Sequence, residues 1–422
     1  GMVYKCHYPT YVMQTARGAK RSPIHDRLAA QRAYFKDVSG WEGADWYAPP
    51  GVEPRVDKLS WGRQPWFPYW AAEHRAARDG VIVMDMSFMS KFLVEGRDAG
   101  RLLNWISANQ VDGAAGQITY TQWLDDAGKL QADLTVAKLD DERYWVVASD
   151  TVHRHVQTWM KRQFGDAHAF AADVTSGYGQ LNIQGPRSRE LMQRLTSADM
   201  SNDAFPFRGV REIDIGFARV LCIRITYLGE LGYELYIPAE QTVHVYDQIV
   251  EASRAPGQDL GLVHAGLKAL ASLRMEKAYR DYGHDIDNTD TVLEVGLGFA
   301  VDLDKPGGFL GKDAVVAQKA RGPLTKRLVQ LLVRDPEPLL FHAEVVRVND
   351  RPCGYVRAAS YGHTLGGAVG LAMIEAPAMP GGVIDPKALS AATWDVEIAG
   401  ARYPATVSLR PLFDPQNAKI KG

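Results

Sequence analysis

The 422-residue sequence has few cysteines and no long hydrophobic run. Its three cysteines, Cys6, Cys222 and Cys353, lie far apart and form no CxxC pair. We therefore expect neither a disulfide framework nor a zinc or other metal site, and the cysteine usage favours a reducing, cytoplasmic compartment. No apolar stretch approaches the roughly 18 residues of a membrane span, and the N-terminus lacks the pattern of a signal peptide. The sequence therefore predicts no membrane association.

The chain also lacks a large net charge of either sign. The 48 Lys and Arg residues oppose 50 Asp and Glu residues, which leaves a formal net charge of -2 and no electrostatic basis for binding nucleic acid. Nucleotide motifs are absent as well. GLGFAV (296–301) has too few glycines for a dinucleotide fingerprint, and Lys312 in GGFLGK is followed by Asp313 instead of Ser or Thr. No G-x-G-x-x-G opens the chain, so we expect no FAD site in this chain.

What the sequence does contain indicates several domains. Residues 1–54 are rich in Gly, Pro, Arg and aromatics, with one helical pattern at 24–35, and we expect them to wrap around the main fold. In residues 55–322, strand and helix patterns mix without regular βαβ spacing, which favours an α+β fold over a doubly wound sheet. After a linker at 322–326, six short β-rich runs in 327–422 predict a small β-barrel or sandwich.

The stretch 219–238, RVLCIRITYLGELGYELYIP, is the most organised part of the chain. It predicts a strand through Tyr227, a tight turn at 229–232 and a second strand at 233–237. Alternation in the second strand places Glu234 opposite a face of Tyr233, Leu235 and Ile237. Glu234 either faces solvent or accepts paired N–H donors from a planar ligand.

Asp133 poses a similar choice. It lies in the second strand of a hairpin predicted for 116–124 and 130–136, with the turn at 125–128. Leu134 and Val136 occupy the opposite face. A strand carboxylate in this setting either faces solvent or takes part in chemistry.

Arg274 interrupts the apolar stripe of a helix predicted for 265–279. An arginine in that position must extend to solvent or find an acidic partner or a polar ligand. Glu234 and Glu276 are the carboxylates that we consider as partners.

Six segments in this order resemble the folate-binding aminomethyltransferase family, which includes the T-protein of the glycine cleavage system. They are GQITYTQWLDDAGKLQADLTV, LNIQGPRS, ITYLGELGYELYIP, GLKALASLRMEKAYRDYGHDID, GGFLGK and YGHTLGGAVGLAMI. The resemblance covers roughly residues 60–415. The opening segments GAKRSPIHDRL, GWEGADWYAP and WGRQPWF, together with His284, are most similar to the folate half of dimethylglycine and sarcosine dehydrogenases.

This resemblance implies a fold built around a central funnel, with two intertwined α+β subdomains in 55–322 and a β-barrel in 327–422. It also implies roles for individual residues. Asp133 matches the active-site aspartate, which orients the folate amine and stabilises the cation formed on one-carbon transfer. Tyr120, Tyr227, Glu234 and Arg274 match residues that bind the cofactor, with Glu234 accepting from the pterin. Residues 148–150 depart from the family because the glycine enzyme has an Asn near this point.

The implied activity is that of a tetrahydrofolate-dependent one-carbon transferase in N-methyl amine demethylation. Its partners would be a small-molecule one-carbon donor and, in the absence of an FAD motif here, a separate flavoprotein subunit. One alternative is direct methyl transfer to folate from a sulfonium or methoxy donor, which needs no oxidant. Another is a folate-binding protein without chemistry, but the K-G-C-Y-x-G-Q-E motif of such relatives is missing.

Overall fold

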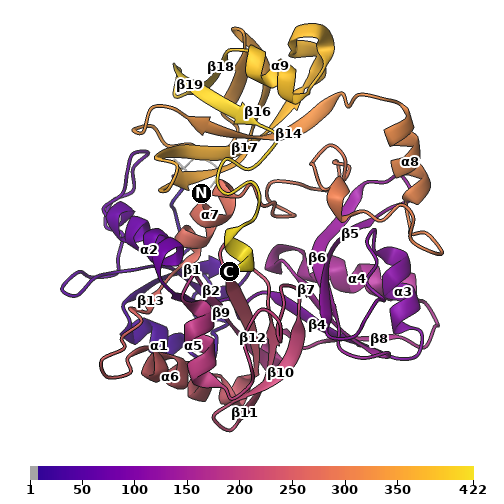
Figure 1. Ribbon diagram of the computed structural model, residues 1–422. Coiled ribbons are helices and arrows are strands. Elements are labelled where there is room, and N and C mark those ends of the chain that lie inside the picture. Colours follow the sequence, from indigo (N-terminus) through magenta and orange to yellow (C-terminus); the bar gives the residue numbers. More distant parts are fainter. Residues whose placement is uncertain (1–7) are drawn as a thin grey trace.

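The computed structural model describes residues 8–422, so Cys6 and the first seven residues of the predicted extension lie outside it. In the described residues, a five-stranded sheet, a six-stranded sheet, a two-stranded sheet and a closed barrel make up the fold (Figure 1). Among the strands of residues 8–422, the pairs are antiparallel except for the parallel pair of β13 (Val263–His264) with β3 (Ile82–Asp85). The predicted α+β class is confirmed. Each helix in the described range is too short or too polar to span a bilayer.

The first sheet has five strands in the order β5-β6-β7-β4-β8. Their bounds are β5 (Gln117–Leu124), β6 (Leu130–Lys138), β7 (Arg143–Ala148), β4 (Ser90–Glu95) and β8 (Phe170–Asp173). Helices α3 (Ala99–Ile106) and α4 (His153–Phe164) cover one of its faces, where their apolar side chains share a core with Leu134 and Val136.

The second sheet has six strands in the order β10-β11-β12-β9-β3-β13. The strands not yet bounded are β10 (Val210–Ile215), β11 (Ala218–Ile223), β12 (Gly232–Pro238) and β9 (Tyr178–Gln184). Helices α5 (Ser188–Leu195) and α6 (Thr242–Ser253) pack on one face of this sheet. The strand predicted through Tyr227 ends at Ile223, because the chain leaves the ladder there for a loop that runs to Leu231.

A closed barrel follows, as predicted from the six β-rich runs. It consists of β14 (Lys326–Val333), β15 (Val345–Val348), β16 (Arg351–Gly362), β17 (Gly367–Glu375), β18 (Trp394–Ile398) and β19 (Ala401–Ser408). Two short helices accompany the barrel strands along the chain. Helix α8 (Lys312–Ala320) precedes β14, and α9 (Pro386–Ala391) lies between β17 and β18.

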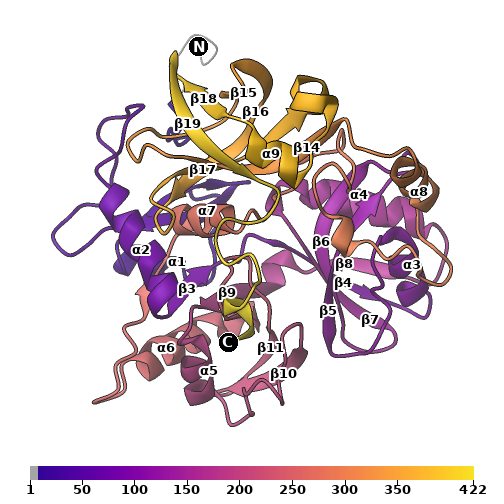
Figure 2. The same cartoon turned by 45° about the horizontal axis from the view of Figure 1, so that its top comes forward.

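Helix α7 (Leu267–Glu276) lies at the centre of the molecule, beneath the barrel (Figures 1 and 2). It contacts β16 and β17 of the barrel, α2 (Phe67–Asp79) and the N-terminal strand β2 (Trp41–Tyr47). Three parts of the chain that are distant in sequence therefore meet on this one helix.

The helix predicted for 24–35 is wrong in its second half. Helix α1 ends early (His25–Ala30), and Ala33–Val38 form strand β1, which pairs with β2. Arg32 has a positive φ of 68°, a conformation that stops an α-helix. The aromatic residues of this region pack as strand side chains, and Trp46 is nearly fully buried in the core that α7 shares.

Candidate functional site

Asp133 lies on the face of the five-stranded sheet that α3 and α4 do not cover. Leu134 and Val136 point into the helix-covered core. Because side chains alternate along a strand, Asp133, Thr135 and Ala137 point the other way. Asp133 is half-buried there. The predicted placement of Leu134 and Val136 opposite Asp133 therefore holds.

Glu234 occupies the equivalent position on the six-stranded sheet. Tyr233, Leu235 and Ile237 belong to the core beneath α5 and α6. Alternation therefore turns Glu234 and Tyr236 to the uncovered face of β12. Glu234 is half-buried, whereas Tyr236 is fully buried.

The uncovered faces of the two sheets pack against each other. Ala137 and Trp145 from the first sheet share an apolar cluster with Tyr236 from the second. The rings of Trp145 and Tyr236 meet edge to face, with centroids 5.4 Å apart. Since Asp133 shares a face with Ala137 and Glu234 shares one with Tyr236, both carboxylates lie on the surfaces that the sheets turn toward each other.

Asp133 receives a hydrogen bond from its cross-strand neighbour. The Nε2 of Gln122 donates to Oδ1 of Asp133 over 2.9 Å, and the two residues pair directly in the β5–β6 ladder. Burial raises the pKa of Asp133 to about 6, although Gln122, Tyr120 and the positive charge of Arg280 oppose the shift. A carboxylate in this state is mostly ionised at neutral pH yet retains appreciable basicity.

Glu234 is held from two sides. The hydroxyl of Tyr236 donates to its Oε2 over 2.6 Å, and Nδ2 of Asn182 lies 3.4 Å from its Oε1. Burial raises the pKa of Glu234 to about 7, against the effects of Tyr236, Asn182 and the charge of Lys91.

Both carboxylates are half-buried, so water reaches them, yet desolvation dominates their pKa shifts. A group on open surface would be fully solvated and would show no such shift. Asp133 and Glu234 therefore lie in recessed positions between the sheets. This combination of partial access and perturbed pKa is typical of functional sites.

Tyr120 and Tyr227 complete the surroundings of Asp133. Burial, followed by the negative charge of Asp133, raises the pKa of Tyr120 well above its usual range. The hydroxyl of Tyr227 donates to the carbonyl oxygen of Arg280 over 2.6 Å. Burial also raises the pKa of Tyr227. The positive charge of Arg274 opposes this shift, whereas the negative charge of Asp133 adds to it. Tyr120 and Tyr227 thus lie within electrostatic range of Asp133, and Arg274 lies within range of Tyr227. The charge that acts on Glu234 is that of Lys91.

Arg274 does not pair with the carboxylates that we considered from the sequence. Its guanidinium binds both oxygens of Asp285 and donates to the carbonyl oxygen of Tyr279 over 3.0 Å. Asp285 is fully buried. Its charge raises the pKa of Arg274 above the ordinary value, and Arg274 in turn lowers the pKa of Asp285. Arg274 therefore anchors the segment that follows α7.

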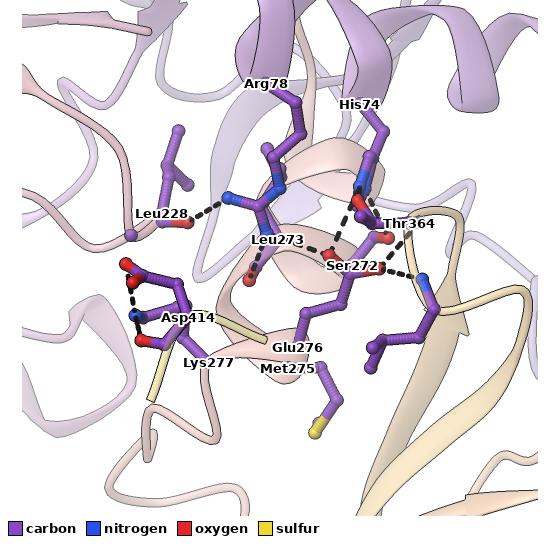
Figure 3. Close-up of polar contacts among 12 residues, drawn as sticks. His74, Arg78, Leu228, Ser272, Leu273, Met275, Glu276, Lys277, Thr364 and Asp414 are labelled. Carbon is purple, nitrogen blue, oxygen red and sulfur yellow. Dashed lines mark hydrogen bonds and ion pairs between the residues drawn. The ribbon is translucent and has the colours of Figure 1, made fainter. Parts of the chain in front are cut away.

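Glu276, the other carboxylate considered for Arg274, joins α7 to the barrel (Figure 3). It is fully buried and accepts from Nη2 of Arg78 over 2.8 Å and from the backbone N–H groups of Thr364 and Leu365 over 2.8 and 3.1 Å. His74 bridges Ser272 and Thr364 beside it, at 2.8 Å to each hydroxyl. We call these residues, Glu276, Arg78, His74, Ser272 and Thr364, the Glu276 cluster.

Three polar residues of the site escaped sequence reasoning. Gln122 is fully buried against Asp133. A regular hairpin with its turn at 125–128 would place Gln122 opposite Gln131, and the register shift between Trp123 and Leu124 makes Asp133 its partner instead. Alternation does predict Tyr236 on the same face as Glu234, two residues further along the strand, but it does not show that the Tyr236 hydroxyl binds the carboxylate. Arg280 left no periodic signal, since it follows the end of α7 in irregular structure.

Comparisons with known proteins bear on this geometry. The family model described as GCVT N-terminal domain matches residues 24–305, and the model described as Glycine cleavage T-protein C-terminal barrel domain matches residues 326–414. The crystal structure of glycine cleavage system aminomethyltransferase T from Bartonella henselae aligns with a TM-score of 0.76. It covers 93% of this chain and 97% of that one at 20% identity, which shows the fold.

Two longer curated proteins are also similar. The chain is 38% identical over its whole length to 4-methylaminobutanoate oxidase (formaldehyde-forming) of Paenarthrobacter nicotinovorans, and it covers 49% of that protein. It is 31% identical to mitochondrial dimethylglycine dehydrogenase of Homo sapiens, across 96% of this chain and 45% of the dehydrogenase. The chain therefore spans about half the length of these relatives.

Proposed function

The chain belongs to the glycine cleavage T-protein family of folate-dependent aminomethyltransferases, and from this premise we propose that it transfers a one-carbon unit from an N-methyl amine to tetrahydrofolate. The product would be 5,10-methylenetetrahydrofolate. Oxidation of the N-methyl group removes two electrons from the amine, so this proposal assigns that step to a flavoprotein segment or partner. The oxidase and dehydrogenase named among the similar proteins support an N-methyl amine as the donor.

Asp133 carries the proposal. The amine to which a one-carbon unit is attached gains positive charge and loses a proton, and both changes favour a nearby anion of moderate basicity. Asp133, with a pKa of about 6, is such an anion at neutral pH. Gln122 fixes the direction of one of its oxygens. Asp133 can therefore stabilise the positive charge and can also hold the released proton on a carboxylate oxygen.

The surrounding residues fit a reduced folate. An ionised carboxylate offers about four acceptor positions, and Glu234 uses two of them for Tyr236 and Asn182. The other two can accept the adjacent N–H groups along one edge of a pterin. Tyr120 and Tyr227 provide aromatic surface near Asp133. When bound, tetrahydrofolate supplies the amine nitrogens that receive the one-carbon unit.

The decisive experiment uses the purified chain, tetrahydrofolate and [13C]formaldehyde, followed by 13C NMR under argon. We expect 5,10-methylenetetrahydrofolate to form faster than in the uncatalysed condensation. Asp133→Asn keeps the shape of the side chain but removes its charge, so it should reduce the enzymatic rate by at least 100-fold, a typical loss for one electrostatic catalyst. Calorimetry should show folate affinity within about tenfold of wild type, or roughly 1.4 kcal/mol.

Further measurements distinguish the proposed transfer from direct methyl transfer and from folate binding without chemistry. Methyl-folate formed by the chain from a sulfonium or methoxy donor, without any oxidant, would replace the proposal with direct methyl transfer. Folate binding without acceleration of any transfer would reduce the protein to a folate-binding one. Equal loss of binding and transfer in Asp133→Asn would remove the catalytic assignment of Asp133.

A further inference from the structure

Tyr236 connects the two halves of the candidate site. Its hydroxyl lies 2.6 Å from Oε2 of Glu234, and its ring packs edge to face on Trp145 of the opposite sheet. The side chain is fully buried, and the ring belongs to the apolar cluster between the sheets. The position of the hydroxyl is therefore fixed by the packing of the two sheets, and rotation of Tyr236 away from Glu234 would open a cavity between them.

The two donors leave Glu234 little freedom. Tyr236 occupies a lone pair of Oε2, and Asn182, which faces Glu234 directly across the β9–β12 ladder, approaches Oε1. A carboxylate held at both oxygens keeps one rotamer, and the unused lone pairs keep one direction. Hydrogen bonds from an O–H donor to a carboxylate are also among the strongest in proteins, so Tyr236 favours the ionised form.

Lys91 on β4 is the charged group that acts on Glu234. Lys91 is fully buried and donates to the carbonyl oxygens of Ser87 and Met89 over 2.9 and 2.7 Å. Burial lowers the pKa of Lys91 to about 7, although the negative charges of Asp85 and Asp173 act to raise it. Lys91 therefore loses charge in the range where Glu234 ionises, whereas the Tyr236 hydroxyl remains a donor throughout that range.

We propose that Tyr236 is a positioning residue that fixes the Glu234 carboxylate and favours its ionised form, so that its free lone pairs face the N–H donors of the pterin. This inference rests on the proposed folate role of Glu234. Removal of the hydroxyl withdraws a donor from the charged form and raises the pKa of Glu234. Folate binding would then be weaker at neutral pH and would recover at higher pH.

The test measures the dissociation constant of tetrahydrofolate, under argon, from pH 5.5 to 9. Wild type and three variants are compared: Tyr236→Phe, Glu234→Gln and the control Tyr233→Phe. Tyr233 is a buried tyrosine on the same strand, but it points to the opposite face. We expect the affinity of Tyr236→Phe to be about tenfold weaker at pH 7, with an inflection about one pH unit above that of wild type and of Tyr233→Phe. Glu234→Gln should be weak at every pH.

A second readout does not depend on folate. In the ligand-free protein labelled with [δ-13C]glutamate, the Glu234 carboxyl signal, assigned by its absence in Glu234→Gln, should titrate at higher pH in Tyr236→Phe than in wild type. An unchanged titration would overturn the inference, as would a loss of affinity that is equal at all pH values. If wild type binds no folate while the titration shifts as expected, Tyr236 still sets the state of Glu234 and the proposed function alone fails.

Discussion

At the scale of single residues, the candidate site contains two carboxylates, Asp133 and Glu234, and each has an amide side chain as its cross-strand neighbour. Gln122 lies opposite Asp133 in one hairpin ladder, and Asn182 lies opposite Glu234 in the other sheet. Each amide contributes an N–H donor to its carboxylate. Such donors lower a pKa that burial has raised. The amides thus favour the ionised form of each carboxylate in positions where desolvation favours the neutral acid.

Gln122→Leu tests this view at Asp133. Loss of the Nε2 donor should raise the pKa of Asp133 above about 6 and move the acid limb of the pH profile of one-carbon transfer upward by about one unit. The profile of kcat/KM from pH 5 to 9 measures this shift. Gln117→Leu is the matched control, because Gln117 begins the same strand but is exposed. An acid limb at the wild-type position in Gln122→Leu would exclude this role for Gln122.

Asp133→Asn should stabilise the ligand-free protein, although it removes activity. Burial raises the pKa of Asp133 from 3.8 to about 6, so the ionised form is less favourable in the folded state than in the unfolded chain. This cost is present above pH 6, falls between pH 6 and 4, and is absent at lower pH. Since Asp133 is partly exposed to solvent, we expect a gain of about 1–2 kcal/mol at pH 8. Urea unfolding at pH 8 and pH 4 measures it, and equal gains at both pH values would contradict the prediction.

At the scale of elements, the alternation of apolar and polar residues was the sequence pattern that predicted strands best. The six β-rich runs of 327–422 correspond to the six strands of the barrel, because a barrel strand has one face in the core and one face outside, and a period of two reports that difference directly. The helix predicted for 24–35 was wrong in its second half. Its apolar residues satisfy a helical spacing, but pairing with β2 and the positive φ of Arg32 decide the structure.

The Arg274–Asp285 pair is an element-scale interaction, since it joins α7 to the segment that follows it. Asp285→Asn leaves the Arg274 guanidinium buried without its counter-ion, and such changes cost about 3–5 kcal/mol. We expect that loss in urea unfolding at pH 7. Asp350→Asn is the control. It breaks the exposed pair of Asp350 with Arg402, and exposed pairs contribute less than about 1 kcal/mol. Similar small losses in both variants would show that Arg274 does not need Asp285.

At the scale of the whole molecule, the sequence predicts candidate site residues but not the partners that the fold gives them. The strand faces of Asp133 and Glu234 followed from local patterns. Asp285, the partner of Arg274, lies in irregular structure that has no period. The partners of Glu276 come from α2 and from the chain after β16, and no local rule places such distant segments together. Long-range pairing of buried charges is decided by how the domains pack.

The contribution of the Glu276 cluster to the packing of α7 on the barrel can be tested by measuring stability at acid pH. Burial raises the pKa of Glu276, but His74 and Arg78 stabilise the ionised form and lower the pKa from 4.5 to about 2. A carboxyl with a depressed pKa contributes its full stabilisation above pH 4.5 and loses it as the pH falls from 4.5 to 2. The difference corresponds to roughly 3 kcal/mol.

Glu276→Gln should therefore lower the stability of the protein at pH 7 by about 3 kcal/mol or more, because it also leaves Arg78 with one carboxylate fewer. The variant should lose less additional stability than wild type between pH 4.5 and 3. Because Glu276 links α7 to the barrel, limited proteolysis near residues 322–326 should be faster in the variant at pH 7. A wild-type-like acid profile in Glu276→Gln would mean that other carboxyls govern the acid stability of the molecule.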